Sequence, residues 1–96
     1  MDFGQMMATL RKALPDLQEN YRVNTLDAFG SYVRTEQTPD SDLDVLVTFS
    51  ETPSLLKFIE MEIYLSDLLG VKVDLVMKHA LKPLLEERIL DEAIPV

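Results

Sequence analysis

Three aspartates stand where two apolar segments could hold them close together. Asp42 and Asp44 are separated by one residue at the start of one apolar segment, and Asp74 lies inside another. Alternate side chains of a strand point the same way, so Asp42 and Asp44 would share a face, with Cα atoms about 6.5 to 7 Å apart. The spacing has two interpretations: a bracket for a divalent cation, or a strand that begins in a solvated loop.

Mutual repulsion of these carboxylates bears on the choice. Two unit charges about 6 Å apart repel by roughly 3 kcal/mol at an effective dielectric near 20, and Asp74 would add to this if the strands were neighbours. A bound cation relieves that cost. The chain has no cysteine and one histidine, so the ligands would be oxygens, which suit Mg²⁺ or Mn²⁺. These ions commonly share their coordination with waters and substrate phosphates.

A calcium loop is a rival interpretation of the same acids. Asp40, Asp42 and Asp44 take positions one, three and five of an EF-hand loop, and Glu51 takes position twelve. Position six of that loop needs glycine for its sharp turn. Val45 stands there instead, and its β-branched side chain begins a strand-like run. The sequence therefore disfavours a calcium site.

A Gly-Ser pair, Gly30 and Ser31, follows the apolar run 23–29. Glycine has no Cβ to keep a phosphate away from backbone N–H groups, and a serine hydroxyl can add a further hydrogen bond. An ordinary turn between two strands would use the same residue types. The pair alone does not distinguish a phosphate site from a turn.

The apolar periodicity predicts the elements that would carry these side chains. Pro15 should interrupt the first helix, and Pro83 is tolerable only in a first turn. Thr52-Pro53 resembles a helix start, and Gly70 can end a helix with a positive φ. The predicted elements are helices over 3–14, 55–69 and 81–93, a short turn or helix over 17–21, and strands over 23–29, 42–49 and 71–77.

Side-chain alternation assigns the faces of the two acidic strands. Residues 43, 45, 47 and 49 of one strand and residues 71, 73, 75 and 77 of the other are apolar and should face a core. Asp42, Asp44 and Asp74 then lie on the opposite face.

Composition limits the classes of function. The 96 residues are 47% hydrophobic and 27% charged, which predicts one globular domain with little surface left for a separate acceptor-binding domain. The formal net charge of −8 has the wrong sign for holding nucleic acid directly through its phosphates. The N-terminus lacks the pattern of a secretion signal, and no apolar run approaches the roughly 20 residues of a membrane span. We therefore expect a cytoplasmic chain without direct nucleic-acid or membrane contact.

Three motifs in a fixed order resemble a known family. G-S-x-x-R begins at Gly30, S-D-x-D ends at Asp44, and V-D-L-V contains Asp74. Together they resemble the nucleotidyltransferases of the DNA polymerase β superfamily, and most closely the minimal nucleotidyltransferases that act as antitoxins to HEPN-domain toxins. The resemblance covers nearly the whole chain. It implies an α/β (α+β) nucleotidyltransferase fold, with residues 1–96 as a single polymerase β-like domain in which helices pack on one face of a small mixed β-sheet.

The resemblance implies catalytic and metal-binding roles for the three aspartates. Asp42 and Asp44 would bind two Mg²⁺ ions, with Mn²⁺ as an alternative. Asp74 would complete the metal site and help deprotonate the acceptor hydroxyl. Two such ions stabilise the attacking and leaving oxygens of an in-line displacement at the α-phosphate.

The resemblance also implies a nucleotide-binding turn. Gly30 and Ser31 would hold the β and γ phosphates of ATP, and Arg34 would contact phosphate or brace the loop. Family members commonly have glycine after that arginine, whereas this chain has Thr35, which reaches positive φ less readily. This departure from the family bears on the geometry of the loop and, through it, on the affinity for the nucleotide.

The implied reaction transfers AMP from ATP to a tyrosine of a HEPN-family toxin, a ribonuclease, with which the chain would form a hetero-oligomer. Its acidic charge is compatible with docking onto a basic RNA-degrading partner. One alternative is a non-catalytic antitoxin that neutralises the toxin by binding alone, as Thr35 and the apolar end 94–96 would allow. A third possibility is transfer to a small molecule such as an aminoglycoside, which the shortage of chain for an acceptor domain disfavours.

Overall fold

Helix α1 (Phe3–Tyr21) opens the computed structural model, which describes residues 1–96. It begins with a capping box, in which the Asp2 carboxylate accepts from Gln5 N and the Gln5 side chain accepts from Asp2 N. The predicted interruption at Pro15 was wrong, because the helix continues to Tyr21. Pro15 is exposed, and Leu17 beyond it is fully buried. Burying that leucine stabilises the fold by about 1.5 to 3 kcal/mol, which offsets much of the roughly 3 kcal/mol cost of the proline.

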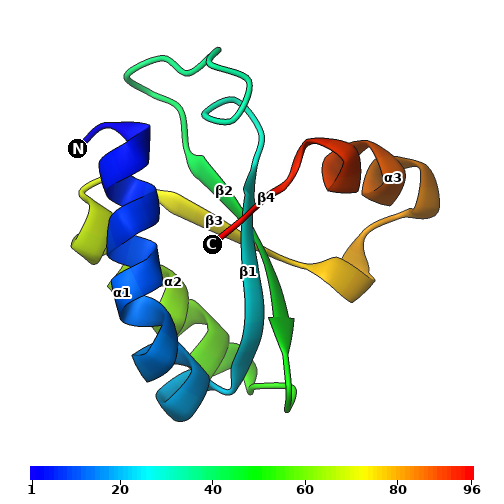
Figure 1. Ribbon diagram of the computed structural model, residues 1–96. Coiled ribbons are helices and arrows are strands. Elements are labelled where there is room, and N and C mark those ends of the chain that lie inside the picture. The colour runs from blue at the N-terminus through cyan, green and yellow to red at the C-terminus, as the bar shows by residue number, and fades with distance from the viewer.

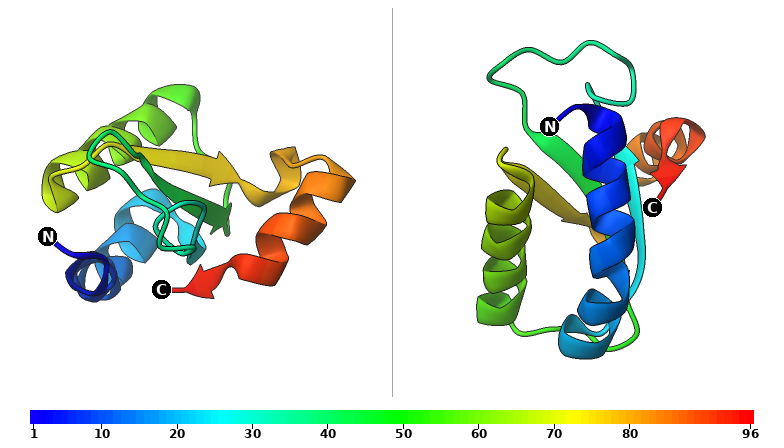
Figure 2. Two further views of the ribbon diagram at one scale, coloured as in Figure 1. Left: turned by 90° about the horizontal axis from the view of Figure 1, so that it is seen from above. Right: turned by 60° about the vertical axis from the view of Figure 1, so that its left-hand side comes forward.

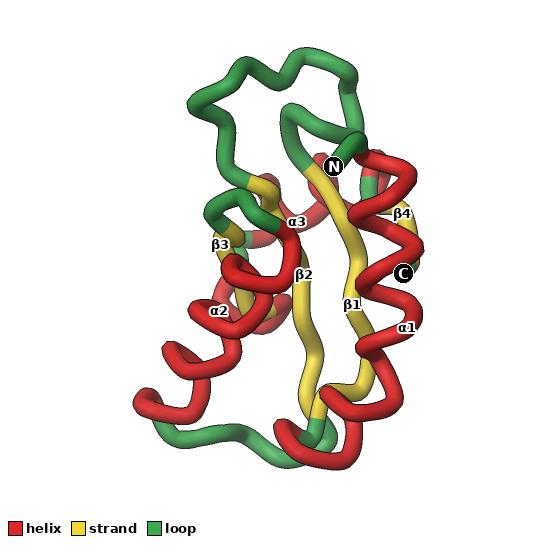
Figure 3. Tube along the Cα trace, turned by 90° about the vertical axis from the view of Figure 1, so that its left-hand side faces the viewer, coloured by secondary structure: helices red, strands yellow, loops and turns green.

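Four strands form one mixed sheet (Figures 1 and 3). They are β1 (Val23–Phe29), β2 (Leu43–Phe49), β3 (Val73–Met77) and β4 (Ile94–Pro95). The order is β3-β2-β1-β4; β1 pairs antiparallel with β2 and β4, whereas β2 pairs parallel with β3. The bounds of β1 were predicted, and β2 and β3 begin slightly later than predicted. The short β4 was not predicted, because two residues that include a proline show no alternation.

Helix α2 (Leu55–Leu69) connects β2 to β3 and so allows them to run parallel. Its N-cap is Ser54, whose hydroxyl accepts from Lys57 N at 3.2 Å. The predicted helix start at Thr52-Pro53 was therefore wrong, because the capping hydroxyl determines where the first turn begins. Gly70 ends the helix as predicted, with a φ of 71°.

Two side chains of α2 hold the outer edge of β3. Glu62 Oε2 accepts from Leu75 N, and Ser66 Oγ accepts from Val73 N, both at 2.9 Å. These N–H groups belong to an edge strand and would otherwise lack a protein partner. The two bonds fix β3, and with it Asp74, against the rest of the fold.

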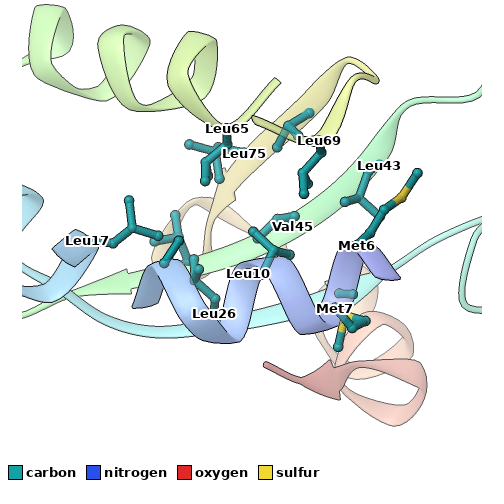
Figure 4. Packing of buried hydrophobic residues seen from close by; sticks show 14 of the residues in the cluster. Met6, Met7, Leu10, Leu17, Leu26, Leu43, Val45, Leu65, Leu69 and Leu75 are labelled. Carbon is teal, nitrogen blue, oxygen red and sulfur yellow. The ribbon is translucent and has the colours of Figure 1, made fainter. Parts of the chain in front are cut away.

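Helices α1 and α2 cover one face of the sheet (Figure 2). The predicted alternation is confirmed, since Leu43, Val45 and Val73 are fully buried beneath them. Figure 4 shows how side chains from both helices meet those of the strands. None of the helices is both long enough and apolar enough to cross a lipid bilayer. The buried cluster consists of Met6, Met7, Leu10, Ala13, Leu17, Val23, Leu26, Ala28, Tyr32, Leu43, Val45, Val47, Met61, Leu65, Leu69, Val73 and Leu75.

Helix α3 (Pro83–Glu92) follows the short 3₁₀ helix η1 (Lys78–Ala80) and lies on the opposite face of the sheet (Figure 2). Pro83 occupies its first turn, as predicted. Ile89 packs with Phe29 and Leu46 in a second buried cluster. The predicted fold class is confirmed. The predicted packing of helices on one face of the sheet holds for α1 and α2, whereas α3 forms a layer on the other face.

The segment 30–42 joins β1 to β2 and is anchored by Tyr32. This residue is only 9% exposed, and its ring stacks on that of Phe3 at a centroid distance of 6.3 Å. Gly30 O accepts from Val33 N and Arg34 N, which closes a tight turn. Thr35 has a φ of 56°, so the loop requires left-handed geometry at this position, which is unfavourable for a residue with a branched Cβ.

Thr35→Gly should stabilise the fold. A side chain at positive φ costs about 1 to 2 kcal/mol, and the greater freedom of glycine in the unfolded chain offsets about 0.4 to 1 kcal/mol of that gain. We expect the free energy of unfolding, measured by urea denaturation, to rise by about 0.5 to 1 kcal/mol. Thr38→Gly in the same loop is the control and should destabilise, because Thr38 has no positive φ and bonds to Ser41. A Thr35→Gly protein no more stable than wild type would contradict the assignment of strain.

Candidate active site

A cleft of about 690 Å³ opens between the sheet and α3, a volume typical of small-ligand sites. One part of its wall is apolar and is formed by Phe29, Val76, Leu81, Leu85 and Ile89. The polar part is formed by Gly30, Arg34, Asp44, Asp74, Arg88 and Glu92. Four residues that the sequence predicts for the site therefore line one cleft, although they come from a loop and two strands.

Asp44 and Asp74 are direct neighbours across the parallel pair of β2 and β3. The next residues, Val45 and Leu75, are also register partners, and both are buried against α1 and α2. Because side chains alternate along a strand, both aspartates point to the face that carries α3. Pairing of the two strands thus brings together carboxylates that are far apart in the sequence.

Burial raises the pKa of the Asp44 carboxyl above its usual range. The nearby carboxylates of Asp74 and Asp42 raise it further, and that of Glu92 contributes in the same direction. The Arg34 guanidinium opposes these effects. A half-buried acid surrounded by like charges, in a cleft, is typical of functional sites.

Gly30 lies against Asp44 with a φ of 84°. A Cβ at this position would overlap the Asp44 carboxylate. Position 30 requires glycine for two reasons: the backbone has a positive φ, and the Asp44 carboxylate lies where a Cβ would be. The backbone N–H of Gly30 points into the cleft region and donates to Glu92 Oε1 at 3.1 Å.

Arg34 is held by two glutamates. Its Nη1 donates to both carboxylate oxygens of Glu92 at 3.0 Å, and its Nε donates to Glu36 at 3.2 Å. Hydrogen bonding to Glu92, and to a lesser extent to Glu36, raises the pKa of the guanidinium. Arg34 therefore lines the cleft and is bonded there to an acid from the far end of the chain.

Asp42 and Ser31 are the two predicted site residues that do not line the cleft. Asp42 precedes β2 and lies 3.8 Å from Lys72 Nζ, although it is near enough to Asp44 to affect its pKa. Ser31 is half-buried, and its carbonyl accepts from Glu36 N at 2.9 Å within the turn. Ser31 directly follows Gly30 of the cleft, and Asp42 is two residues from Asp44.

The donor set fits a metal ion that shares its coordination with a substrate. No group of three or more acidic or histidine side chains is gathered closely enough to form a protein cage. Asp44 and Asp74 nevertheless supply adjacent carboxylates whose charges repel. Mg²⁺ is usually held by one or two carboxylates together with waters and substrate phosphates, so these residues suit that ion better than a calcium cage.

Sequence reasoning did not identify the contribution of α3 to the cleft. Arg88, Glu92 and three of the five apolar lining residues, Leu81, Leu85 and Ile89, come from the segment after β3, whose apolar spacing indicated only a helix. Glu92 is 62 residues from Gly30 along the chain, and no local pattern connects them. Arg88 and Glu92 are four residues apart and so lie one turn apart on the same face of the helix. This spacing is the only sequence signal that could have suggested that both belong to one site.

Comparisons with known proteins identify the family and the fold of this chain. Residues 10–96 match the nucleotidyltransferase domain family. Protein adenylyltransferase MntA of Thermococcus cleftensis is 53% identical over 81 residues, covering 84% of this chain and 82% of that protein. A structure described as a "putative minimal nucleotidyltransferase" has a TM-score of 0.83 at 41% identity, covering 100% of this chain and 97% of that one. A chain in the complex of an MNT antitoxin with a tri-AMPylated HEPN toxin of Shewanella oneidensis shares the fold, with a TM-score of 0.68 at 21% identity over 94% of this chain and 70% of its own.

Asp44→Asn should stabilise the chain in the presence of a chelator. The folded carboxyl has a raised pKa, so between about pH 4 and that pKa the folded state binds more protons, and stability falls as pH rises. The asparagine side chain does not ionise, so the variant does not lose stability in this way. Its melting temperature should be a few degrees above that of wild type at pH 7, and the difference in melting temperature should shrink toward pH 4. Circular dichroism melts across this range measure the effect. Asp16→Asn, an exposed site on α1, is the control of equal charge, and a pH-independent difference at position 44 would contradict the prediction.

Proposed function

Because this chain belongs to the nucleotidyltransferase domain family, we propose that it is a protein adenylyltransferase that acts as an antitoxin. It transfers AMP from ATP to a tyrosine of a partner ribonuclease toxin of the HEPN family, with Mg²⁺, or Mn²⁺ in its place, as the cofactor. The observation that carries the proposal is the convergence of Gly30 N–H, Arg34, Asp44 and Asp74 on one cleft. Residues 1–96 act as one nucleotidyltransferase domain in this proposal.

The nucleotide-binding part of the proposal rests on the turn after β1. Gly30 offers a backbone N–H with no Cβ in front of it, and Ser31 follows with a hydroxyl. Arg34 supplies a guanidinium, which suits phosphate oxygens because of its planar set of donors. These three residues bind the β and γ phosphates of ATP in the proposed complex.

The chemical part rests on Asp42, Asp44 and Asp74. These carboxylates hold two Mg²⁺ ions when the nucleotide binds, and the ions supply charge neutralisation for an in-line displacement. Asp74 accepts the proton of the tyrosine hydroxyl. The hydroxyl oxygen then forms a bond to the α-phosphorus, while the bond from that phosphorus to the pyrophosphate breaks. The apolar wall of the cleft, to which α3 contributes Leu85 and Ile89, limits the access of water to the reacting phosphate.

The partner part rests on charge, exposed apolar surface and relatives. The net charge is −8, which favours association with a basic partner. Leu55, Leu56, Ile59 and Ile63 of α2 are 41 to 81% exposed, and exposed apolar groups of this size favour a chain that works in a hetero-oligomer. The relative from Thermococcus cleftensis is named a protein adenylyltransferase, and the Shewanella oneidensis complex contains an AMPylated toxin. We place this activity in the cytoplasm.

The proposed reaction can be tested with the purified partner. Incubation with ATP and Mg²⁺ should add an AMP-sized mass to a tyrosine of the toxin, detected by mass spectrometry. Asp44→Asn and Asp74→Asn should each lower the rate by about 100-fold, which corresponds to a loss of about 2.7 kcal/mol of transition-state stabilisation. Asp16→Asn should retain the wild-type rate. Absence of AMP on the toxin when both proteins are folded would sink the adenylyltransferase proposal.

A second candidate is an antitoxin that neutralises its toxin by binding alone. Two observations favour it: Glu92 already bonds to the donors Gly30 N–H and Arg34, and Thr35 adopts a positive φ. The double change Asp42→Ala with Asp44→Ala separates the two candidates. If catalysis silences the toxin, cells that express toxin and the doubly changed antitoxin should lose growth, whereas full protection would favour binding alone. Co-purification of the complex checks that the variant still binds.

A further inference from the structure

We propose that Glu92 is a built-in competitor for the nucleotide phosphates, and that its carboxylate must leave the phosphate donors before ATP can bind. The inference rests on the proposed function, since it concerns the affinity of the same site. It makes Glu92 a residue that sets nucleotide affinity and does not touch the reacting atoms.

The contacts of Glu92 are those that a phosphate would make. Its Oε1 accepts from Gly30 N at 3.1 Å and from Arg34 Nη1 at 3.0 Å, and its Oε2 accepts from the same nitrogen at 3.0 Å. The side chain is only 24% exposed. A carboxylate held by a backbone N–H and a guanidinium mimics an oxyanion in an anion site.

The same donors cannot serve Glu92 and a triphosphate fully at the same time. Gly30 has one N–H, which Glu92 occupies, and Arg34 uses Nη1 for Glu92 and Nε for Glu36, so only its Nη2 makes no hydrogen bond to the protein. The phosphates would also bring negative charge beside Glu92 in a cleft that already contains Asp44 and Asp74. Binding of a phosphate to the Gly30 N–H and to Arg34 Nη1 therefore requires the Glu92 carboxylate to move away.

The helix offers Glu92 a second partner. Arg88 is one turn earlier on α3, lines the same cleft, and makes no ion pair in this structure. Residues four apart on a helix are neighbours, so a rotation of the Glu92 side chain can exchange Arg34 for Arg88. Ile89 remains packed on Phe29 and Leu46, and the helix itself does not need to move. The two arrangements form a switch that nucleotide binding biases.

The population of the two arrangements sets the affinity. If only about one molecule in ten has Glu92 away from the donors, the apparent dissociation constant for ATP is about tenfold higher than the intrinsic one. Removing the competitor should therefore tighten ATP binding by about tenfold. AMP lacks the β and γ phosphates that the proposed function assigns to Gly30 and Arg34, so its affinity should change little.

The test compares two substitutions with a matched control. Glu92→Gln removes the charge and keeps the shape, whereas Glu92→Asp keeps the charge but is too short to reach both donors. Glu87→Gln, an exposed position on the same helix, changes the net charge as Glu92→Gln does. Isothermal titration of each protein with ATP and with AMP, in the presence of Mg²⁺, gives the dissociation constants, and circular dichroism verifies folding. If Glu92→Gln does not fold, Glu92→Asp carries the test.

The proposal expects both Glu92 variants to bind ATP about tenfold more tightly than wild type and Glu87→Gln, with no such gain for AMP. Unchanged or weaker ATP binding by the Glu92 variants overturns it. Tighter ATP binding by Glu92→Gln alone also overturns it, because that result would mean charge repulsion without occupation of the donors. An equal increase in affinity for AMP overturns it as well. Failure of wild type and every variant to bind ATP would instead contradict the proposed function.

Discussion

The parallel pairing of β2 with β3 is the interaction on which the candidate site depends. It brings Asp44 beside Asp74, at the cost of concentrating like charges where burial already raises the pKa of Asp44. The buried leucines and valines of the same strands hold this arrangement, because they pack against α1 and α2 on the other face of the sheet. A hydrophobic core on one face thus maintains an electrostatically unfavourable cluster on the other, which is how a fold retains residues that favour function over stability.

The edge of the sheet and its turn complete the positioning of these groups. Glu62 and Ser66 of α2 bond to the free edge of β3, so Asp74 is held from both sides of its strand. Tyr32 anchors the turn after β1 to α1, which keeps Gly30 against Asp44. Thr35 carries a positive φ within the same loop. The local strain is sustained by packing elsewhere, as expected where the rest of the structure determines a loop's shape.

Helix α3 gives the cleft part of its apolar wall, Leu85 and Ile89, and its only acid from outside the three motifs, Glu92. Its end carries Glu92 onto the donors that the proposed reaction assigns to phosphate. The ion pair of Glu92 with Arg34, which holds α3 against the turn after β1, therefore also competes with the nucleotide phosphates. Stability without nucleotide and affinity for nucleotide depend on one side chain, and improving either one weakens the other.

Local sequence patterns predicted most of the helices and strands, though neither β4 nor the course of α1 beyond Pro15, and they predicted the buried faces of β2 and β3. Apolar alternation predicted which side of β2 and β3 would be buried, and the order of Gly30, Asp44 and Asp74 indicated the family, because both signals lie within short segments. Tertiary structure decided what local patterns cannot contain. Burial of Leu17 carried α1 through Pro15, strand order made Asp44 and Asp74 neighbours, and the docking of α3 placed Glu92 beside Gly30, 62 residues away. These outcomes depend on the free energy of long-range packing, which no single segment encodes.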